Sequence, residues 1–343
     1  MIIENKPLVS IVILNYNGKK YIKNCIESIK NQRYSNIKLI LVDNASTDGS
    51  VIGLKKLYPE IKLIINNQNL GSAKGNNIGV ESSKGEYLFF LNIDTKLDKD
   101  CIYNLVEIYE SDAEMGICAC KELSYDGKIQ WNCGIGVDIF GYSLQGVPKK
   151  VFHASGSSLF IKKELFDKLN GFDESYFMYK DDIDLCWRAQ LLGYKVVGVP
   201  SAIVFHEWGG VSLSNRGEKL RSGAVEKEKY ILNIKKRYYG ELNSIKNILK
   251  NYSFFTLLWI LPLYILINFF EIIFFLIMGK PKAISEIYIK SYFHICKNLK
   301  HLFKSRKEIQ KQRKINDYKI LKRMQKTIGK FSSLKLVGVP KIE

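Results

Sequence analysis

An apolar run that stops abruptly at polar residues, residues 87–95 (YLFFLNIDT), is the feature that most limits the possible folds. A continuous apolar and aromatic run of this length is typical of a strand that is buried on both faces of a parallel sheet. Asp94 follows the carboxyl end of this strand, where open α/β sheets bind their ligands. We therefore predict that Asp94 holds a metal ion against the phosphates of a nucleotide. The alternative is that Asp94 caps a helix that begins near Asp98.

Three further apolar runs precede this strand, and a polar loop follows each of them. They are residues 9–15 (VSIVILN), 37–43 (IKLILVD) and 61–65 (IKLII). Helical segments separate the runs, which predicts a parallel sheet with right-handed crossovers and places the polar loops on one edge. Asp43 ends the second run, where it can accept a hydrogen bond from a nucleoside base or ribose, or serve as an ordinary turn carboxylate.

Two common nucleotide-binding loops are missing from the sequence. Neither Gly-x-Gly-x-x-Gly nor Gly-x-x-x-x-Gly-Lys-Ser/Thr occurs. The dinucleotide-binding fingerprint and the phosphate-binding loop of NTPases are therefore excluded, so a nucleotide must be bound by other means.

The second half of the chain contains a loop rich in carboxylates and aromatics, residues 171–184 (GFDESYFMYKDDID), which leads into a predicted helix. Asp184 has Arg188 four residues later and is expected to pair with it, for about 0.3–0.5 kcal/mol. Asp182 has no such cation. The helix amino terminus lowers the proton affinity of Asp182, whereas the neighbouring Asp181 raises it. These opposed effects suit a general base, so we predict that Asp182 acts as one.

Positive charge is concentrated at the carboxyl end. The chain has 52 lysines and arginines against 34 aspartates and glutamates, a net charge of +18. From residue 280 onward there are 18 basic and 4 acidic residues, a net +14, which leaves +4 for residues 1–279. Such a tail is compatible with binding to nucleic acid, but that function would need basic and aromatic residues along a groove.

The cysteines indicate a reduced protein. There are seven, without regular spacing, and no apolar segment stands at the amino terminus, so we expect a cytosolic catalytic part. Cys118, Cys120 and Cys133 could ligate zinc, but the paired Cys-x-x-Cys spacing of zinc sites is absent. Buried strand cysteines are the favoured interpretation.

Residues 254–278 (FFTLLWILPLYILINFFEIIFFLIM) form an almost wholly apolar segment of 25 residues, enough for about 37 Å of helix. Both flanks are basic, so a single span would export one positive flank. Pro262 can break the helix, and Asn268 and Glu271 are costly at the bilayer centre. We expect a re-entrant or interfacial (monotopic) helical hairpin on the cytoplasmic face of the membrane, with the basic tail on anionic headgroups. A buried pair of helices in a soluble protein is the alternative.

Six segments in a fixed order carry a resemblance to a known family. They are residues 9–18 (VSIVILNYNG), 42–50 (VDNASTDGS), 69–79 (NLGSAKGNNIG), 91–95 (LNIDT), 171–196 and 204–210 (VFHEWGG). In this order they resemble the motifs of the family 2 glycosyltransferases, in the rhamnosyltransferase-like branch. The resemblance implies a GT-A fold, a nucleotide-sugar donor, a divalent metal (Mn²⁺ or Mg²⁺) and inversion at the anomeric carbon.

The resemblance also assigns the donor and metal sites. The donor-binding residues would be Asn15, Asn17, Asp43, Asn69, Gly71, Asn76 and Asn92. Asp94 and His206 would bind the metal. Asn92 departs from the family pattern, because it replaces the first carboxylate of Asp-x-Asp with a neutral oxygen ligand.

Catalytic and acceptor residues follow from the same resemblance. Asp182 would be the catalytic base, with Asp181 beside it as the other candidate, since Lys180 and Asp181 stand where the family usually has Glu before the catalytic Asp. Gly156 and Trp187 would bind the acceptor, in a site between the 131–160 segment and the 171–184 loop.

The predicted fold class is α/β, with a mainly parallel GT-A sheet flanked by helices and a carboxyl-terminal helical, membrane-associated region. Residues 1–240 would form the catalytic domain, with a nucleotide-sugar half (1–95) and an acceptor half (96–240). Residues 241–279 would be the membrane-associated segment and residues 280–343 a basic helical tail.

The expected function is transfer of a sugar, with rhamnose suggested by the branch, from a nucleotide-sugar donor to a glycan or polyprenyl-linked acceptor in cell-surface polysaccharide synthesis. The expected partners include an anionic membrane surface and no nucleic acid. A sugar nucleotidyltransferase is the alternative enzyme, and a nucleic-acid-binding protein acting through the tail is the non-enzymatic alternative. Glycoside hydrolysis is discounted, because its paired carboxylates need neither nucleotide loops nor a metal.

Overall fold

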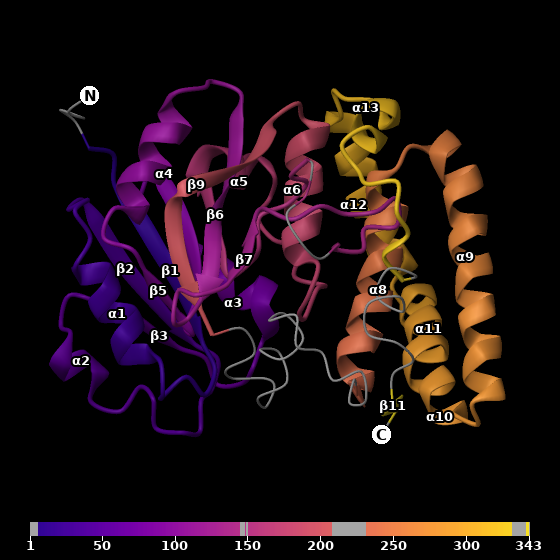
Figure 1. Ribbon diagram of the computed structural model, residues 1–343, viewed down its shortest axis with the longest axis horizontal. Helices are drawn as coiled ribbons and strands as arrows, with labels where there is room; N and C mark the ends of the chain where they lie inside the picture. The colour runs from indigo at the N-terminus through magenta and orange to yellow at the C-terminus, as the bar shows by residue number, and fades with distance from the viewer. Residues whose placement is uncertain (1–5, 145–147, 149, 208–230, 331–340, 343) are drawn as a thin grey trace.

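The computed structural model describes residues 6–144, 148, 150–207, 231–330 and 341–342. An α/β body forms one side of the molecule and a group of helices forms the other (Figure 1).

One mixed sheet of nine strands lies at the centre of the described residues. Along its main path the strands are β3 (Lys62–Ile65), β2 (Ile37–Asp43), β1 (Val9–Asn15), β4 (Tyr87–Asn92), β8 (Ser158–Lys162), β6 (Met115–Ser124), β9 (Lys195–His206) and β5 (Thr95–Leu97), and β7 (Gln130–Cys133) pairs with β6. The first four are mutually parallel, whereas β8 runs antiparallel to both of its neighbours. The mainly parallel sheet predicted from the apolar runs is confirmed.

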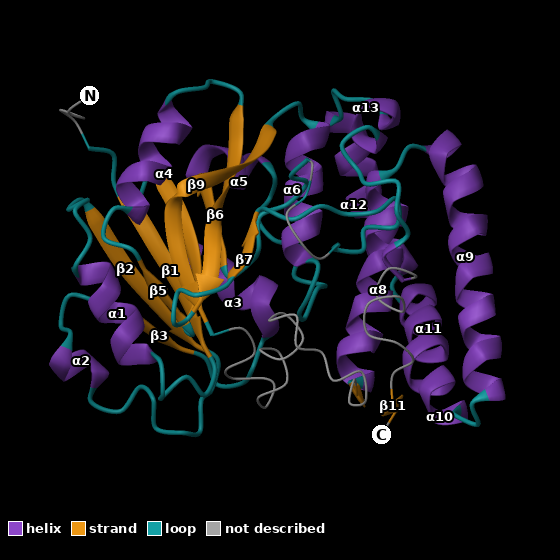
Figure 2. Cartoon of the chain, viewed as in Figure 1, coloured by secondary structure: helices purple, strands orange, loops and turns teal. Residues whose placement is uncertain are grey.

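Helices cover both faces of this sheet (Figure 2). Because side chains alternate along a strand, β1 sends Ile11 into one apolar cluster and Val12 into another. The first cluster lies under α1 (Ile22–Lys30), α2 (Leu54–Leu57) and α4 (Cys101–Glu110). The second lies under α3 (Gly71–Glu81), α5 (Lys163–Lys168) and α6 (Asp181–Leu191). β4 contributes Phe89 to the first cluster and Phe90 to the second, so it is buried on both faces as predicted.

A second group of helices follows the sheet (Figure 1). It contains α8 (Ile234–Asn251), α9 (Phe254–Ile277), α10 (Pro281–Ile284), the π-helix η1 (Ser285–Ile289), α11 (Lys290–Lys297), α12 (Leu299–Gln312) and α13 (Asp317–Leu321), and β10 (Ile231–Leu232) pairs with β11 (Lys341–Ile342). A third apolar cluster joins α6, α8 and α9 through Trp187, Ile245 and Tyr264. The boundary predicted after residue 240 falls inside α8, so we group residues 241–251 with the helix that packs on α6.

The apolar segment forms one continuous helix, α9, of 24 residues with Pro262 inside it. The hairpin predicted for residues 254–278 is therefore wrong. Proline removes one backbone donor, but Ile260 before it and Tyr264 after it are buried in the same cluster, and this packing keeps the two halves in line. By length and composition, α9 is the one helix among the described residues that could cross a membrane.

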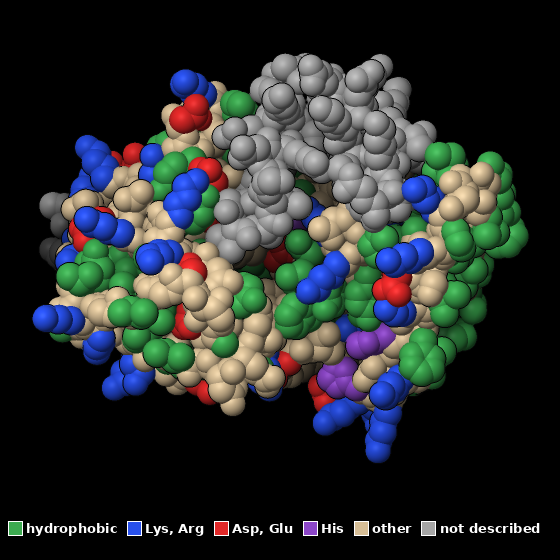
Figure 3. Space-filling model, turned by 90° about the horizontal axis from the view of Figure 1, so that it is seen from below, with side chains coloured by type: hydrophobic (Ala, Val, Ile, Leu, Met, Phe, Trp, Pro, Cys, Tyr) green, Lys and Arg blue, Asp and Glu red, His purple; other side chains and the backbone are tan. Residues whose placement is uncertain are grey.

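One face of α9 is apolar and exposed. Only 28% of an apolar 18-residue stretch of this helix is buried, so the alternative of a buried helix pair does not fit. Apolar side chains line the edge of the molecule formed by α9 (Figure 3). The large ones, between 48 and 79% exposed, are Phe254, Phe255, Leu258, Trp259, Ile265, Leu266, Phe269, Phe270, Leu276 and Ile277.

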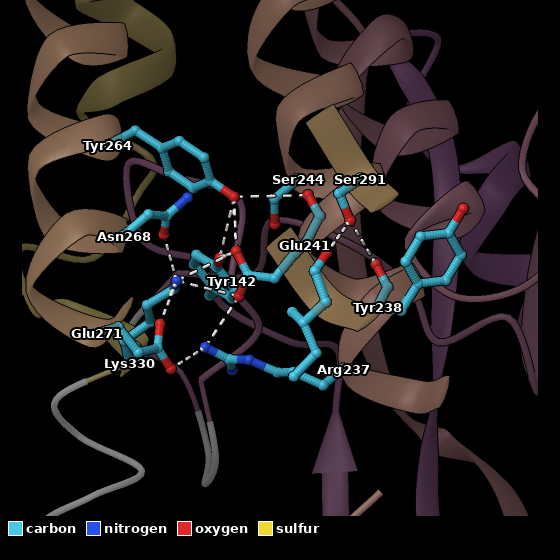
Figure 4. A network of polar contacts seen from close by, with 12 residues as sticks. Tyr142, Arg237, Tyr238, Glu241, Ser244, Tyr264, Asn268, Glu271, Ser291 and Lys330 are labelled. Atoms are coloured by element: carbon cyan, nitrogen blue, oxygen red, sulfur yellow. Dashed lines mark hydrogen bonds and ion pairs between the residues drawn. The ribbon is translucent and has the colours of Figure 1, made fainter. Parts of the chain in front are cut away.

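The polar residues of α9 that made a membrane span costly have partners inside the protein (Figure 4). Lys330 Nζ lies 2.7 Å from Glu271 Oε2 and 3.0 Å from Oε1 of Glu241 on α8. Lys330 also donates to Asn268 Oδ1 at 2.5 Å. Arg237 bridges the two glutamates, at 2.9 Å from Glu241 and 2.6 Å from Glu271. This ion cluster therefore fastens α9 to α8 and to Lys330.

Removing one cation from this cluster should destabilise the protein strongly. Lys330→Ala leaves two glutamates to share Arg237, and a broken buried ion pair typically costs about 3–5 kcal/mol. Lys290→Ala is the control, because Lys290 makes an exposed pair with Glu286 one helical turn away, worth about 0.3–0.5 kcal/mol. Denaturant unfolding of both variants measures the difference. Equal, small losses would show that the cluster contributes little.

Candidate active site

The carboxyl ends of β1, β2 and β4 bring Asn15, Asp43 and Asn92 to one edge of the sheet. Asn15 Nδ2 donates to Asp43 Oδ1 at 2.7 Å. Ser46 donates to the same carboxylate through its amide at 3.0 Å and its hydroxyl at 2.5 Å. Asp43 is only 1% exposed, so its carboxylate orders the following loop from inside. Its contact with a nucleoside stays a prediction.

The next two loops are shaped by local hydrogen bonds and one close approach. Asn17, in a left-handed conformation (φ 56°), accepts the Thr47 amide at 2.8 Å. Asn69 Oδ1 accepts the Gly71 amide at 3.0 Å. A Cβ on Gly71 (φ 83°) would lie 2.1 Å from the Phe177 carbonyl oxygen, so glycine is required where α3 meets the 171–184 loop. Of the predicted donor residues, Asn15, Asp43 and Asn92 thus end neighbouring strands at one sheet edge. Asn17 follows β1, Asn69 and Gly71 stand just before and at the start of α3, and Asn76 lies within α3.

Asp94 and His206 come together where β5 pairs with β9. Asp94 Oδ1 lies 3.3 Å from His206 Nε2, and both side chains are buried. Glu122 Oε2, on β6, lies 3.7 Å from His206 Nδ1. Asp94 does not cap a helix, because β5 follows it and α4 begins only at Cys101.

Two carboxylates make this a site for positive charge. Burial lowers the pKa of His206, but the hydrogen bonds and charges of Asp94 and then Glu122 outweigh it and raise that pKa to about 10. Burial raises the pKa of Glu122, but His206, Ser157 and Ser158 lower it to about 2. A cation is therefore favoured between Asp94 and Glu122, here as the protonated imidazole.

The side chains present fit a divalent ion in part. A carboxylate oxygen from Asp94 and an imidazole nitrogen from His206 are ligand types that Mn²⁺ accepts. Within the described ranges, no group of three or more His, Cys, Asp or Glu side chains could hold a metal. A bound ion would therefore take its remaining ligands from outside this set of side chains.

The two candidate bases open α6. Asp181 is buried and accepts a hydrogen bond from Ser72 Oγ at 2.8 Å. Asp182 is 18% exposed at its side chain, and its Oδ2 lies 3.6 Å from His153 Nδ1. The amide of Gly156 donates to the same oxygen at 3.0 Å. Gly156, predicted to bind the acceptor, therefore adjoins the predicted base.

The two aspartates differ in proton affinity. Burial, and then the charge of Asp182, raise the pKa of Asp181. Burial acts on Asp182 in the same direction, but the charge and hydrogen bond of His153 and the amide of Gly156 lower its pKa. From the sequence, we expected Asp182 to experience one effect that raises its pKa and one that lowers it. In the structure, the pKa of Asp181 is raised and the pKa of Asp182 is lowered. Asp182 therefore gives up its proton more readily than Asp181.

A short turn, residues 155–158, joins the base to the metal residues. Gly156 donates to Asp182 from one side of the turn, and the hydroxyl of Ser157 donates to Glu122 from the other. Glu122 faces His206, which pairs with Asp94.

Two predictions for α6 had opposite outcomes. Asp184 accepts a hydrogen bond from Arg188 Nε at 2.7 Å, so the predicted pair is confirmed. Trp187 has no exposed surface and packs edge-on against Phe152 and Tyr252. An acceptor cannot contact it there, so its predicted direct role does not fit the structure. Its four-residue spacing on the helix marked a core face instead.

Three residues near these groups were missed in the sequence. Ser72 contacts Asp181, His153 lies beside Asp182, and Glu122 faces His206. Glu122 carried a usable signal, since a carboxylate so soon after the apolar residues 117–120 (ICAC) is unusual in a buried strand. Ser72 and His153 depend on contacts 109 and 29 residues away in the sequence, respectively, which no local pattern reveals.

Comparison with known proteins gives a consistent result. The model of the family "Glycosyl transferase family 2" matches residues 10–170. An uncharacterised glycosyltransferase of Haemophilus influenzae is 38% identical over 99 residues, 28% of this chain and 40% of that protein. The low-salt glycan biosynthesis hexosyltransferase Agl10 of Haloferax volcanii is 28% identical over 202 residues, 53% of this chain and 61% of that protein. Both matches thus span less than two thirds of the relative.

A solved structure supports the fold. The mannosyltransferase PcManGT of Pyrobaculum calidifontis, in complex with GDP-Man and Mn²⁺, superposes with a TM-score of 0.51 at 18% identity, over 71% of this chain and 64% of that one. At this identity the likeness concerns the fold alone. The predicted α/β GT-A architecture is confirmed.

The raised pKa of Asp181 has a measurable consequence for stability. Above about pH 4, where an unfolded aspartate titrates, folding must either retain a proton on Asp181 or bury its charge. This penalty is absent below the unfolded pKa and complete above the folded one, and each tenfold rise in proton affinity on folding adds about 1.4 kcal/mol to it. Asp181→Asn should therefore melt near the wild-type temperature at pH 4 and a few degrees above it at pH 8.

Thermal unfolding across this pH range, with Asp167→Asn on the exposed surface of α5 as control, measures the effect. A constant difference between Asp181→Asn and wild type at every pH would contradict the assignment.

Proposed function

We propose, from the match of residues 10–170 to the model of glycosyl transferase family 2, that this chain is an inverting glycosyltransferase. It moves a sugar from a nucleotide-diphosphate donor to a hydroxyl of a glycan or lipid-linked acceptor. The observation that carries the proposal is the arrangement around the 155–158 turn. An ionised, partly exposed Asp182 lies on one side of it, and the buried pair Asp94 and His206 lies on the other.

The base is prepared for proton transfer by its surroundings. The amides of Gly156 and Ile183 and the ring of His153 stabilise the Asp182 carboxylate, so it is ionised before the acceptor arrives. It then accepts the proton of the acceptor hydroxyl as that oxygen attacks the anomeric carbon. Asp181, whose pKa is raised, would bring no second full charge to the same place.

Asp94 and His206 would hold the divalent ion, Mn²⁺ or Mg²⁺, that the family resemblance implies. Such an ion supplies positive charge against the departing diphosphate. Around it, the sheet-edge loops would hold the nucleotide, with Asn92 as the exposed polar group nearest to Asp94 in the chain.

The finer assignments rest on similarity. A relative named for glycan biosynthesis supports a role in cell-surface polysaccharide or glycan synthesis. The rhamnosyltransferase-like motifs make a rhamnose nucleotide the first donor to test. A sugar nucleotidyltransferase remains the alternative enzyme, and it would consume a nucleoside triphosphate and release pyrophosphate.

The nucleic-acid alternative has less support, because part of the basic tail is used inside the protein. Arg306 donates to the Leu249 and Tyr252 carbonyl oxygens, and Lys330 is buried in the ion cluster. These cations are not available to phosphates.

Asp182→Asn should reduce turnover about 10²–10⁴-fold with donor affinity near normal, because it removes the base but not the donor site. The measurement begins with a screen of nucleotide sugars for release of nucleoside diphosphate by the wild type with Mn²⁺. Nucleoside triphosphates with sugar phosphates form the parallel screen. Asp181→Asn should cost less, and the reverse order would move the base to Asp181.

Asp94→Ala should abolish transfer and the Mn²⁺ dependence of donor binding, since the site loses its carboxylate ligand. Calorimetric titration with the donor, with and without Mn²⁺, reads this out independently of turnover. Donor binding that still responds to Mn²⁺ in the variant would remove Asp94 from the site.

The proposal places the enzyme on the cytoplasmic face of a membrane, held by α9 without crossing. The exposed apolar face of α9 can lie among acyl chains, while Glu271 and Asn268 point to Lys330 on the protein side. A crossing helix would carry this ion cluster into hydrocarbon, which is costly. The basic tail can add roughly 1 kcal/mol per well-placed cation on anionic headgroups. This position would present the active site to a lipid-linked acceptor such as a polyprenyl diphosphate sugar.

Phe269→Asn combined with Phe270→Asn should weaken binding to anionic lipid vesicles at least about tenfold, because two exposed phenyl rings no longer enter the bilayer. The control is Ile52→Asn combined with Leu57→Asn, two exposed apolar residues in and beside α2. Co-sedimentation with phosphatidylglycerol-containing vesicles measures both. Equal binding of the two double variants would remove α9 from the membrane contact.

A further inference from the structure

One side of α8 is polar and fully buried, which is unusual for a helix of this length. Six polar or charged residues on it are no more than 2% exposed: Asn243, Ser244, Lys246, Asn247, Lys250 and Asn251. Burying so many polar groups is unfavourable unless each makes hydrogen bonds. Their partners are concentrated in one place, the 171–184 loop that leads to the candidate bases.

Several of the hydrogen bonds from α8 to this loop go to the main chain of the loop. Asn243 Nδ2 donates to the carbonyl oxygens of Met178 at 2.9 Å and Tyr179 at 2.7 Å. Lys246 donates to the Ser175 carbonyl at 2.6 Å. These bonds depend on the path of the loop backbone and not on the side chains at those positions.

The backbone of this loop is strained at the two residues that directly precede the candidate bases. Tyr179 (φ 66°) and Lys180 (φ 63°) are consecutive non-glycine residues in the left-handed region, and they directly precede Asp181. Such conformations are unfavourable for L-residues and persist only where the surroundings hold them. Asn243 holds the carbonyl of Tyr179, and Ser244 accepts a hydrogen bond from the partly buried Lys180 side chain.

The side chain of Asn243 donates two hydrogen bonds, but its own acceptor atom is left unpaired. Its Oδ1 is buried and has no hydrogen-bond partner in the part of the chain that the structure describes. An unpaired buried acceptor is unfavourable, so the value of this side chain lies in its two donated hydrogen bonds.

We infer that Asn243 is a positioning residue for sugar transfer, because it fixes the left-handed pair Tyr179–Lys180 and thereby aims Asp182 at the acceptor. The inference rests on the proposed function and extends its active site to α8. On the opposite side of the loop, Ser72 of α3 donates its amide to the Phe177 carbonyl at 2.7 Å. The loop is thus held between the donor half and α8, and loss of Asn243 removes the two hydrogen bonds that hold the Met178 and Tyr179 carbonyls.

The test uses the full chain with Asn243→Ala and, as a milder change that keeps one donor, Asn243→Ser. The control is Asn233→Ala, which removes the hydrogen bond from the Lys236 amide that caps the start of α8 and leaves in place every hydrogen bond named above between α8 and the loop. Hydrogen exchange of peptides covering residues 176–186 is the first readout. We expect faster exchange there in both Asn243 variants, more in the alanine one, and wild-type exchange there in the control.

Turnover of the nucleotide sugar found in the donor screen is the second readout. Asn243→Ala should lower kcat about 10–100-fold while the donor KM stays within about twofold, because misplacing a base affects the chemical step and leaves the donor site intact. Asn233→Ala should keep the wild-type kcat. Unchanged exchange at 176–186, or faster exchange with unchanged kcat, would overturn the inference. If no nucleotide sugar is turned over by the wild type, the proposed function fails, and exchange alone decides whether Asn243 holds the loop.

Discussion

The burial of β4 on both faces is the constraint from which the site follows. Phe89 fills the core on one side of the sheet and Phe90 fills it on the other, so the middle of the strand has no position for an exposed polar side chain. Exposed polar groups can stand only at or beyond its carboxyl end, where Asn92 is the last residue of β4 and Asp94 follows it. Because β1 and β2 are parallel to β4 and in register with it, their polar ends collect on the same edge. A ligand site at this edge is thus a consequence of an apolar sheet centre.

Sequence patterns correctly predicted the features that depend on residues close together in the chain. Apolar runs marked the strands, and four-residue spacing marked the pairing of Asp184 with Arg188. The same local patterns gave wrong predictions where packing between distant segments determines the structure. Pro262 predicted a break in the apolar helix, but contacts of α9 with α8 keep that helix continuous. Trp187 was assigned to a ligand surface, although Phe152 and Tyr252 pack against it and it has no exposed surface.

The individual residues of the candidate site could be predicted from the sequence, but the contacts that connect them could not. Asp94, His206 and Asp182 were each found from a motif, but no motif relates them to one another. That relation comes from the turn at Gly156 and Ser157, whose hydrogen bonds reach Asp182 in one direction and Glu122 in the other. The two ends of this link are 60 residues apart in the sequence, and only the antiparallel insertion of β8 between β4 and β6 brings them together. The ionisation states of Asp181 and Asp182 depend on the same long-range packing.

The partner of Glu271 also bears on the order in which the chain can fold. Lys330 follows Glu271 by 59 residues, so a growing chain makes α9 well before it makes the cation that neutralises its inward face. Until residue 330 has left the ribosome, docking α9 onto α8 would leave Glu241 and Glu271 with one arginine between them, a poorly compensated arrangement. We expect α9 to stay undocked during this interval, with its apolar length open to a membrane or a chaperone. Docking of α9 onto α8 would then occur late in synthesis, after Lys330 has emerged.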